Sequence, residues 1–469
     1  MRSLARAMNT KRVSRAMCLG MLVVLGVAVC AGLVRTFSRP SIRVDGVGYY
    51  APLASVLFDN DLDLRNEIAH AERWMRKDVF SGPDGVVDPF PVGAAILWAP
   101  ALIVAKAIDR ATHGDTAGGW RFASRGFEPR YVSALALASG LEALLGGVLL
   151  YWLARFRTSV LPAMAGTVGA MLGTPVVYYA LADPSYAHSA SFLACSALLA
   201  ATLSEKHRRV PIWALGTLWA LVALVRWQDG VLGVILAPRL LREARAARAA
   251  GIGACLRALT LFVLPACLVL LPQVLFWKRI YGHFFVATLG MQLMDWGRPR
   301  ILPFLISTWQ GAFVWSPLFL VGFAGLRCVP ERGLRFALWT ALALEVYTCS
   351  AARDWWAGGS FGARRLVAVA PFAGLGLALW AQAAFEAQGP VARKRKALVL
   401  GLVTLGTAWN LRLAQYNVTG LIPNNPANPR AYERHYPAGD PHRQLYPLWD
   451  YARLGHELWD AEKQLWSAR

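Results

Sequence analysis

The chain contains a succession of apolar runs, most of them long enough to cross a lipid bilayer as a helix. The runs lie at residues 17–34, 91–105, 131–154, 159–182, 186–204, 210–238, 258–277, 301–326, 336–352, 366–385 and 397–411. A helix needs about 20 apolar residues to span the hydrocarbon core. The pattern therefore predicts an all-α, polytopic integral membrane protein with about 11–12 transmembrane or re-entrant helices.

Composition excludes the main alternatives to a membrane protein. Hydrophobic residues make up 56% and charged residues 16%, whereas soluble domains have about 45–50% and about 25%. The 19 Trp and 20 Phe residues provide far more burial than a disordered chain has. The net charge of +21 lies between the apolar runs rather than in a nucleic-acid-binding module. We therefore expect membrane lipids, and no nucleic acid, among the partners.

Basic clusters predict the orientation of the chain. Lys and Arg are enriched in cytoplasmic connections, and clusters lie in residues 1–16, 206–209, 239–248, 327–335 and 393–396. This places residues 37–90, 183–185, 278–300, 353–365 and 412–469 outside. We expect a cytoplasmic N-terminus (1–16), a transmembrane domain (17–411) and a polar, amphipathic tail on the outer face (412–469). The predicted location is the plasma (inner) membrane.

Two segments leave the number of crossings open. Arg155 and Arg157 are basic enough to be cytoplasmic, which gives one crossing too many before them. Either the short run 91–105 is re-entrant or the Arg155 region departs from the charge rule. Residues 210–238 form one helix or a hairpin of two, because Arg226 and Asp229 interrupt the run. A mutual salt bridge or exposure at the hairpin tip would satisfy that pair.

The common motifs of soluble enzymes are missing from the sequence. It contains no Walker loop, GxGxxG, HExxH or GxSxG. The seven cysteines lack CxxC spacing, so neither a disulfide framework nor a zinc site is indicated. The acidic run 59–63 lacks the downstream Gly and Glu of an EF-hand and is interpreted as a solvated turn. We expect no cofactor and no metal.

The predicted outer loop 37–90 carries the first candidate for catalysis. Asp45 lies close to the end of the first apolar run, within the sequence DGVGYY. A carboxylate there can take a proton from an acceptor hydroxyl or amine. Tyr49 and Tyr50 are suited to stacking on a substrate at the interface, and the glycines to close approach of a ligand. The alternative is an Asp-Gly turn without catalytic function.

The layout resembles that of the membrane glycosyltransferases of the GT-C fold. The resemblance rests on a first helix, an outer loop that opens with Asp45 in DGVGYY, and its closing sequence PFPVGAAILWAP (89–100). In that superfamily, which includes protein O-mannosyltransferases and lipid A aminoarabinose transferases, an early Asp is the base and a polyprenyl-phosphate-linked sugar is the donor. This chain departs from both families, because Gly46 follows Asp45 and no HPP or KPP triplet stands at 89–91. A distant branch is implied.

A phosphate-linked donor gives the external basic residues a role. Negative charge grows on the phosphate as the glycosidic bond breaks, and Arg or Lys stabilises it. The segment 353–365 (RDWWAGGSFGARR) is the best candidate for this role. Its alternative is an aromatic and basic interfacial anchor. The residues assigned to substrate binding here are Lys278, Arg298, Trp355, Trp356, Arg364 and Arg365. His188 follows an Asp-Pro turn and is either a ligand contact or part of that turn.

Together these features predict a glycosyltransferase that acts on the outer face of the membrane. Asp45 would deprotonate an acceptor, which attacks the anomeric carbon in line and inverts it. The acceptor is a lipid, a glycan or a protein. A transporter or flippase of an anionic lipid-linked substrate is the alternative, and it would use Arg226 and Asp229 without bond cleavage. A non-catalytic membrane scaffold is a third interpretation.

Overall fold

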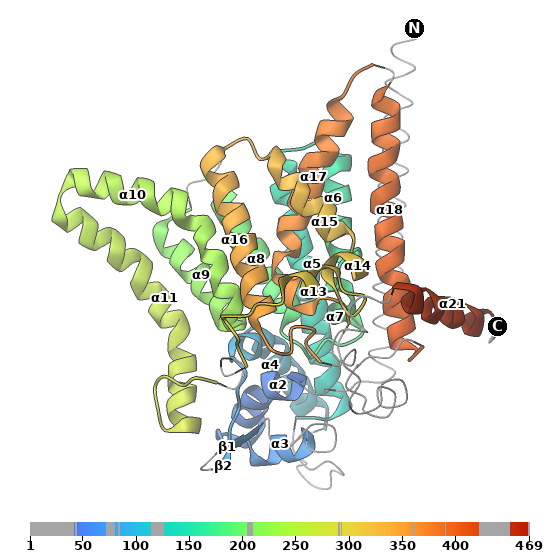
Figure 1. Cartoon of the computed structure of the whole chain (residues 1–469). Coiled ribbons are helices and arrows are strands. Elements are labelled where there is room, and N and C mark those ends of the chain that lie inside the picture. The colour runs from blue at the N-terminus through green and yellow to red at the C-terminus, as the bar shows by residue number, and fades with distance from the viewer. Residues whose placement is uncertain are drawn as a thin grey trace.

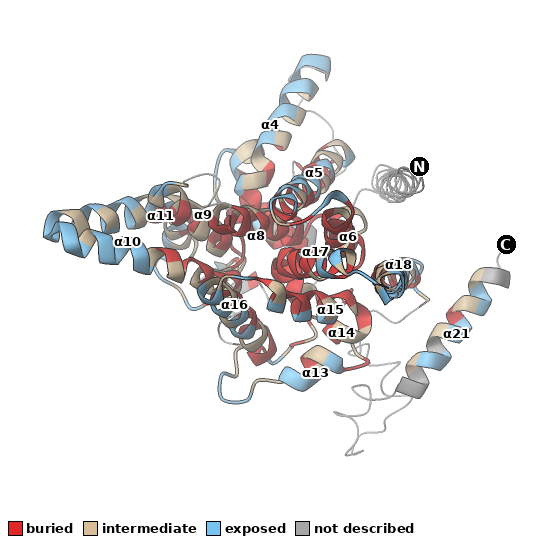
Figure 2. Cartoon of the chain, turned by 90° about the horizontal axis from the view of Figure 1, so that it is seen from above, coloured by how far each residue is buried: buried red, intermediate tan, exposed pale blue. Residues whose placement is uncertain are grey.

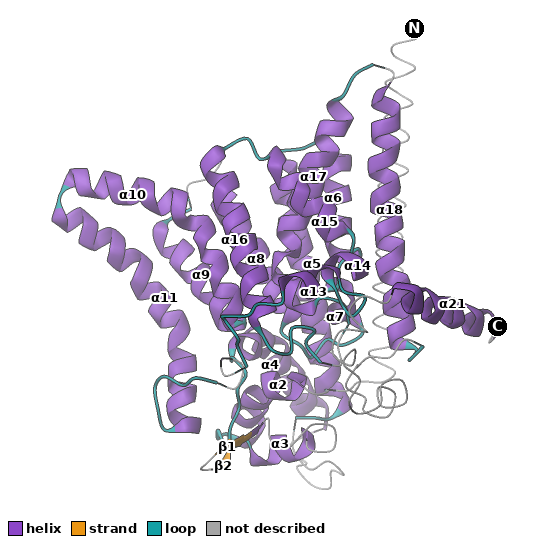
Figure 3. Cartoon of the chain, viewed as in Figure 1, coloured by secondary structure: helices purple, strands orange, loops and turns teal. Residues whose placement is uncertain are grey.

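The computed structural model is almost entirely helical, which confirms the predicted all-α class. It describes residues 42, 45–71, 80–82, 85–113, 126–203, 210–288, 291, 293–358, 361–389, 391–421 and 451–467. The predicted first helix, 17–34, lies outside these residues. Among them, the strands are β1 (Ser81–Gly82) and β2 (Gly85–Val86), which pair antiparallel with Ser81 opposite Val86 (Figure 3).

The helices follow one another with short connections. The first half of the chain contains α2 (Asp45–Ala54), the π-helical turn η1 (Ser55–Asp59), α3 (Arg65–Ala71), α4 (Gly93–His113), α5 (Pro129–Arg155), α6 (Val160–Leu172), α7 (Val176–Leu181), α8 (His188–Leu203) and α9 (Ile212–Val225). The second half contains the 3-10 helix η3 (Trp227–Leu236), α10 (Ala237–Ala250), α11 (Ile252–Tyr281), α13 (Ile301–Ile306), α14 (Ala312–Trp315), α15 (Leu318–Gly325), η4 (Leu326–Cys328), α16 (Arg332–Ala351), η5 (Arg364–Val369), α17 (Ala370–Glu386), α18 (Val391–Val418) and α21 (Tyr451–Ser467).

Among the residues that the structure describes, four helical segments are long and apolar enough to cross a membrane: α5, α11, η5 with α17, and α18. Their length and composition are those of an integral membrane protein. Two predicted spans are instead broken into shorter helices. Residues 159–182 divide into α6 and α7, and 301–326 divide into α13, α14 and α15. Pro175 and Pro317 lie at these breaks, and proline cannot donate the backbone hydrogen bond that a continuing helix requires.

Helix α17 forms the centre of the bundle, and α5, α6, α8 and α15 pack around it (Figure 2). In its membrane-length segment, 83% of the residues are buried inside the protein. The close approach depends on small residues. A Cβ at Gly376 would overlap the carbonyl oxygen of Gly322 on α15, so only glycine fits there. Helices α10 and α11, by contrast, extend away from the bundle (Figures 1 and 2).

The described basic clusters lie in α10, directly before and at the start of α16, and at the start of α18. They are at one end of the bundle, and α2 and α3 lie at the other (Figure 1). Arg157 forms an ion pair with Glu331 at 3.0 Å, directly before α16, so the Arg155 region lies at the basic end. Helix α4 lies at the end of the bundle that carries α2 (Figure 1). It extends outward from the bundle, because it is seen lengthwise where α17 and α18 are seen end-on (Figure 2). The segment 91–105 therefore does not run parallel to these two helices, which favours the re-entrant alternative.

Residues 210–238 fold as a hairpin rather than a single helix. Helix α9 runs to Val225, the chain turns at Arg226 in an extended conformation, and η3 returns along α9. The two arms are joined by the Trp219 indole, which donates to the Gly230 carbonyl at 2.9 Å. The hairpin places Arg226 at its tip, inside the protein, with only 4% of its surface exposed.

The predicted tail differs from the structure at its start. Helix α18 continues to Val418, so residues 412–418 belong to the long helix. Helix α21 lies beside the C-terminal end of α18 and runs in a different direction (Figure 1). Arg412 on α18 pairs with Glu462 on α21 at 2.5 Å, and Tyr416 also donates to Glu462. The expected amphipathic segment is therefore a helix that is tied to α18.

Candidate functional site

Two residues predicted from different parts of the chain meet in the structure. Asp45 is the first residue of α2, and Arg364 is the first residue of η5. Their side chains form an ion pair, with Arg364 Nη2 lying 2.8 Å from Asp45 Oδ2. The Arg364 side chain is 12% exposed and that of Asp45 is 23% exposed. A partly accessible carboxylate and guanidinium thus form the centre of the site.

The glycines beside Asp45 position α2 against the protein. A Cβ at Gly46 would overlap the Ser185 hydroxyl, and one at Gly48 would overlap the Phe90 ring. The sequence analysis expected these glycines to let a ligand approach the backbone. That expectation is wrong, because protein side chains fill the space beside them. Asp45 begins a helix rather than an Asp-Gly turn. The packing on Ser185 explains why α2 places Asp45 next to the 183–187 connection.

An aromatic wall borders the Arg364 side chain. The guanidinium carbon lies 4.9 Å from the centre of the Tyr186 ring, a cation–π contact. Tyr186 stacks on His188 with an angle of 8° between the rings. The ring of Tyr179 lies 4.3 Å from that of His188. Burial raises the pKa of Tyr186 well above its ordinary value, so its hydroxyl stays protonated. His188 is a buried support of this wall, because only 4% of it is exposed.

Tyr49 and Tyr50 have different environments. Burial raises the pKa of Tyr49 to about 12, with Arg226 opposing this shift and Asp45 adding to it. Tyr49 is therefore a neutral hydrogen-bond donor that experiences the charges of the site. Tyr50 is fully buried, and its hydroxyl donates to the Gly126 carbonyl at 2.7 Å. This side chain belongs to the core, where it does not contact solvent, and the prediction that it binds substrate loses its basis.

The side chain of Arg365 is held by Asp354 and is not part of the pair formed by Asp45 and Arg364. Its Nη2 lies 2.7 Å from Asp354 Oδ1 and 3.3 Å from the Asp354 carbonyl oxygen. Trp355 is 4% exposed and packs in the main core. Trp356 contacts Trp355 edge to face, with the ring centres 5.7 Å apart. The segment 353–365 therefore contributes Arg364 to the site, while these other side chains secure the segment itself.

A buried charge network lies beneath η5 and connects to the site. Arg226 pairs with Asp229 at 3.4 Å, and its Nη1 also lies 3.4 Å from the Arg365 carbonyl oxygen. The Ser191 hydroxyl donates to Asp229 at 2.5 Å. Glu345 on α16 is also fully buried. Of the two alternatives for Arg226 and Asp229, the mutual salt bridge is present. It also fixes the backbone that carries Arg364.

Two further predicted phosphate ligands lie in other surroundings. Lys278, near the end of α11, donates to the Gly282 carbonyl at 2.7 Å and lies 5.2 Å from the Phe284 ring centre. Arg298 is exposed in a turn whose backbone pairs with the end of α16, where Asp295 donates to the Ala351 carbonyl. The contacts of both residues are local. They are therefore not included in the site around Asp45.

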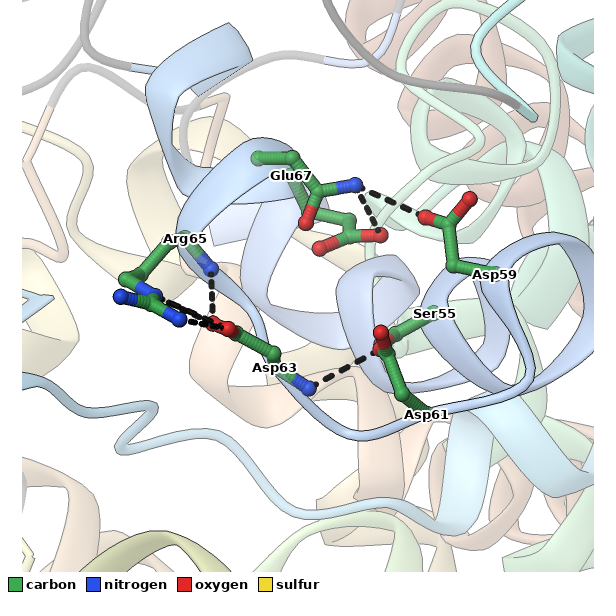
Figure 4. Close-up of polar contacts among 7 residues, drawn as sticks. Ser55, Asp59, Asp61, Asp63, Arg65 and Glu67 are labelled. Atoms are coloured by element: carbon green, nitrogen blue, oxygen red, sulfur yellow. Dashed lines mark hydrogen bonds and ion pairs between the residues drawn. The ribbon is translucent and has the colours of Figure 1, made fainter.

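The acidic run after α2 forms a hydrogen-bonded turn (Figure 4). Ser55 donates to Asp61 at 2.7 Å, and Arg65 Nε donates to Asp63 at 2.8 Å. Asn66 donates to Asp59 at 2.7 Å and to Glu67 at 3.1 Å. Within the part of the chain that the structure describes, no group of three His, Cys, Asp or Glu side chains is arranged to hold a metal ion. The turn connects η1 to α3 and begins at Asn60 with a φ of 61°.

Glu67 makes this turn sensitive to pH. Burial, and then the neighbouring Asp59, raise the pKa of Glu67 from 4.5 to about 8. Between these values the folded protein keeps a proton that the unfolded chain releases, so the free energy of unfolding decreases as pH rises through this window. We expect Glu67→Gln to reduce this decrease, measured as the thermal unfolding midpoint from about pH 5 to about pH 8.

Asp63→Asn is the matched control for that measurement. The hydrogen bond from Arg65 lowers the pKa of Asp63 to about 2. Its contribution to stability is present above the ordinary pKa and is lost only as pH falls toward about 2. The Asp63→Asn variant should therefore keep the wild-type slope above the ordinary pKa of Glu67. An unchanged slope in Glu67→Gln would contradict the assignment.

Sequence reasoning missed two members of the site. Tyr186 lies within ADPSYAH, where only the charged and imidazole side chains were considered. Aromatic rings are common partners of Arg side chains, and Tyr186 is the partner of Arg364 here. Arg226 was assigned to the hairpin and to the transporter alternative, but not to the support of the segment that carries Arg364. Its connection with Arg365 depends on how α9, η3 and η5 pack, and local spacing carries no signal for that.

Comparison with known proteins finds solved structures whose fold is similar to that of this chain. No protein-family model and no curated protein matches the chain. Two crystal structures of ArnT from Cupriavidus metallidurans, a GT-C aminoarabinose transferase, are similar. The one bound to undecaprenyl phosphate has a TM-score of 0.49 and 14% identity, and covers 89% of this chain and 73% of that chain. The apo structure has a TM-score of 0.47 and 14% identity, and covers 87% and 72%. This similarity concerns the fold alone, so function is inferred below from the contacts of this chain.

Proposed function

We propose that the protein is a membrane glycosyltransferase that transfers a sugar from a polyprenyl-phosphate donor. The observation that carries the proposal is the pairing of Asp45 with Arg364 in a partly exposed site. The site contains the two groups that the reaction needs: a carboxylate that can accept a proton and a cation that can stabilise phosphate. The apolar helices around it suit a lipid-linked donor.

The site supports a mechanism in which one displacement transfers the sugar. Asp45 takes the proton of the acceptor hydroxyl or amine, and that atom bonds to the anomeric carbon as the bond to the phosphate oxygen breaks. The electron pair leaves with the phosphate, where Arg364 stabilises the added negative charge. Tyr49, which keeps its proton, can donate a hydrogen bond to the donor. In-line attack inverts the anomeric centre.

The arrangement of charges supports a site on the outer face. The basic clusters that the structure describes, at 239–248, 327–335 and 393–396, lie at the end of the bundle opposite α2 (Figure 1), and such clusters favour the cytoplasm. Asp45 then faces the outside of the plasma membrane. A transporter of the same anionic lipid is the alternative, but Arg226 and Asp229, on which that interpretation depends, are engaged with each other and with the Arg365 backbone.

Arg364→Ala tests the phosphate role. Hydrogen bonds to charged groups contribute about 1.5–3 kcal/mol, so the affinity for undecaprenyl phosphate, measured by native mass spectrometry or thermophoresis in detergent, should fall by about ten- to a hundred-fold. Undecaprenyl phosphate serves as the probe because it carries the leaving group without a sugar. Arg298→Ala, which removes an exposed Arg of the 293–300 turn, is the matched control and should bind normally. Equal affinity in wild type and Arg364→Ala would exclude the phosphate role.

A further inference from the structure

The two central side chains of the site, Asp45 and Arg364, bind each other. Arg364 Nη2 lies 2.8 Å from Asp45 Oδ2. A carboxylate oxygen that accepts hydrogen bonds from a guanidinium has fewer lone pairs free to take the acceptor's proton. A guanidinium that serves a carboxylate has fewer N–H groups for a phosphate. The pair as it stands is thus unfavourable for both of its proposed roles.

The surroundings of Arg364 limit how it can bind a second anion. The guanidinium carbon lies over the Tyr186 ring, 4.9 Å from the ring centre, so this side of Arg364 is occupied by the aromatic ring. A planar guanidinium recognises anions through its N–H edge rather than its face. The N–H groups that Arg364 directs to Asp45 would therefore also have to bind a phosphate. Both side chains are partly exposed, at 12% and 23%, so an incoming phosphate can reach them.

The backbone on both sides of the pair is fixed, so an exchange of partners needs only side-chain rotation. Arg365 is held by Asp354 through its side chain and by Arg226 through its carbonyl. On the other side, α2 is anchored by Val47 and Tyr50, both fully buried. These contacts keep Asp45 and Arg364 close while their ion pair opens.

We propose that Asp45 and the donor phosphate compete for Arg364, so that donor binding frees the carboxylate to take the acceptor proton. This inference rests on the proposed function. Before the donor binds, Asp45 Oδ2 is held by Arg364. When the phosphate takes over the guanidinium, this oxygen loses its partner and can contact the acceptor hydroxyl or amine. The base is therefore activated only when a donor is in place, which limits futile reactions.

The test is the affinity of Asp45→Asn for undecaprenyl phosphate, compared with wild type under the same conditions. Removing the competing charge should tighten binding by about ten-fold. Undecaprenol, which lacks the phosphate, should bind both proteins equally. Asp63→Asn removes one negative charge from an exposed pair with Arg65 and should not change either affinity. Asp45→Ala repeats the test if the Asn variant does not fold.

Binding and transfer separate the two hypotheses. Equal or weaker binding of undecaprenyl phosphate by Asp45→Asn overturns the competition, whatever happens to transfer. Tighter binding together with full transfer supports the competition but removes Asp45 as the base of the proposed function. Tighter binding by Asp63→Asn as well would show a general charge effect and would also overturn the competition at Arg364.

Discussion

Asp45→Asn is expected to lower the rate of sugar transfer by a factor of about 10²–10⁴, the usual contribution of a general base. The amide has the shape of the carboxylate and can still accept a hydrogen bond from Arg364, but it cannot take the acceptor proton. The measurement is the initial rate in proteoliposomes with a lipid-phosphate sugar that the wild-type protein turns over. Donor binding should not weaken, and by the competition proposed above it should tighten, so the loss of activity should appear in the maximal rate.

Asp63→Asn provides the control for that loss. Asp63 lies in the turn that follows α2 and pairs with Arg65 in an exposed position (Figure 4). Replacing it changes the charge of the same region by the same amount without touching Arg364. A wild-type rate in this variant and a large loss in Asp45→Asn would localise the effect. A wild-type rate in both variants would remove Asp45 from the reaction.

Arg226→Ala is expected to cost about 3–5 kcal/mol of stability, the usual effect of removing one partner of a buried ion pair. Arg226 is 4% exposed and Asp229 is fully buried. Without the guanidinium, Asp229 and the nearby Glu345 remain in the interior without a cation. The carbonyl of Arg365 also loses the hydrogen bond from Arg226 and keeps the one from the Cys349 thiol, at 3.6 Å. The measurement is the thermal or denaturant-induced unfolding of the purified protein in detergent.

Two further variants serve as a control and a rescue for this prediction. Arg157 pairs with Glu331 at 3.0 Å, but both side chains are partly exposed, at 14% and 27%. Arg157→Ala should therefore cost only about 0–1 kcal/mol. Adding Asp229→Asn to Arg226→Ala should recover part of the loss, because the amide carries no charge to bury. Equal stability of Arg226→Ala and wild type would show that the network does not hold the hairpin tip.

The membrane class and the bundle followed from hydrophobic run lengths, because burial in lipid requires long apolar helices. The breaks inside those runs were also visible as Pro175 and Pro317, and they could have been predicted from proline chemistry. The direction of α4 could not be predicted in this way. Its length of 21 residues suits a span, but in the fold it extends outward from the bundle instead of running parallel to α17 and α18.

The candidate site was predicted residue by residue, but its assembly was not. The chemistry of Asp45 and of Arg364 indicated a base and a phosphate ligand, and a carboxylate attracts a guanidinium wherever the fold brings them together. Which Arg it meets depends on how the fold brings the start of η5 to the start of α2. Sequence reasoning favoured the segment 353–365 but also included Lys278 and Arg298, whose contacts prove to be local. The glycines of DGVGYY were likewise interpreted without knowing that Ser185 and Phe90 fill the space beside them.

The most direct test of the central claim follows the fate of a polyprenyl-phosphate sugar that carries one label on the sugar and another on the lipid. The purified protein is reconstituted in liposomes with this donor and an extract of outer-surface acceptors. A glycosyltransferase predicts that the labels separate, with the lipid label recovered as polyprenyl phosphate and the sugar label on the acceptor, and that Asp45→Asn prevents the separation. If both labels stay in one molecule that moves across the membrane, the protein is a transporter and the proposed function is wrong.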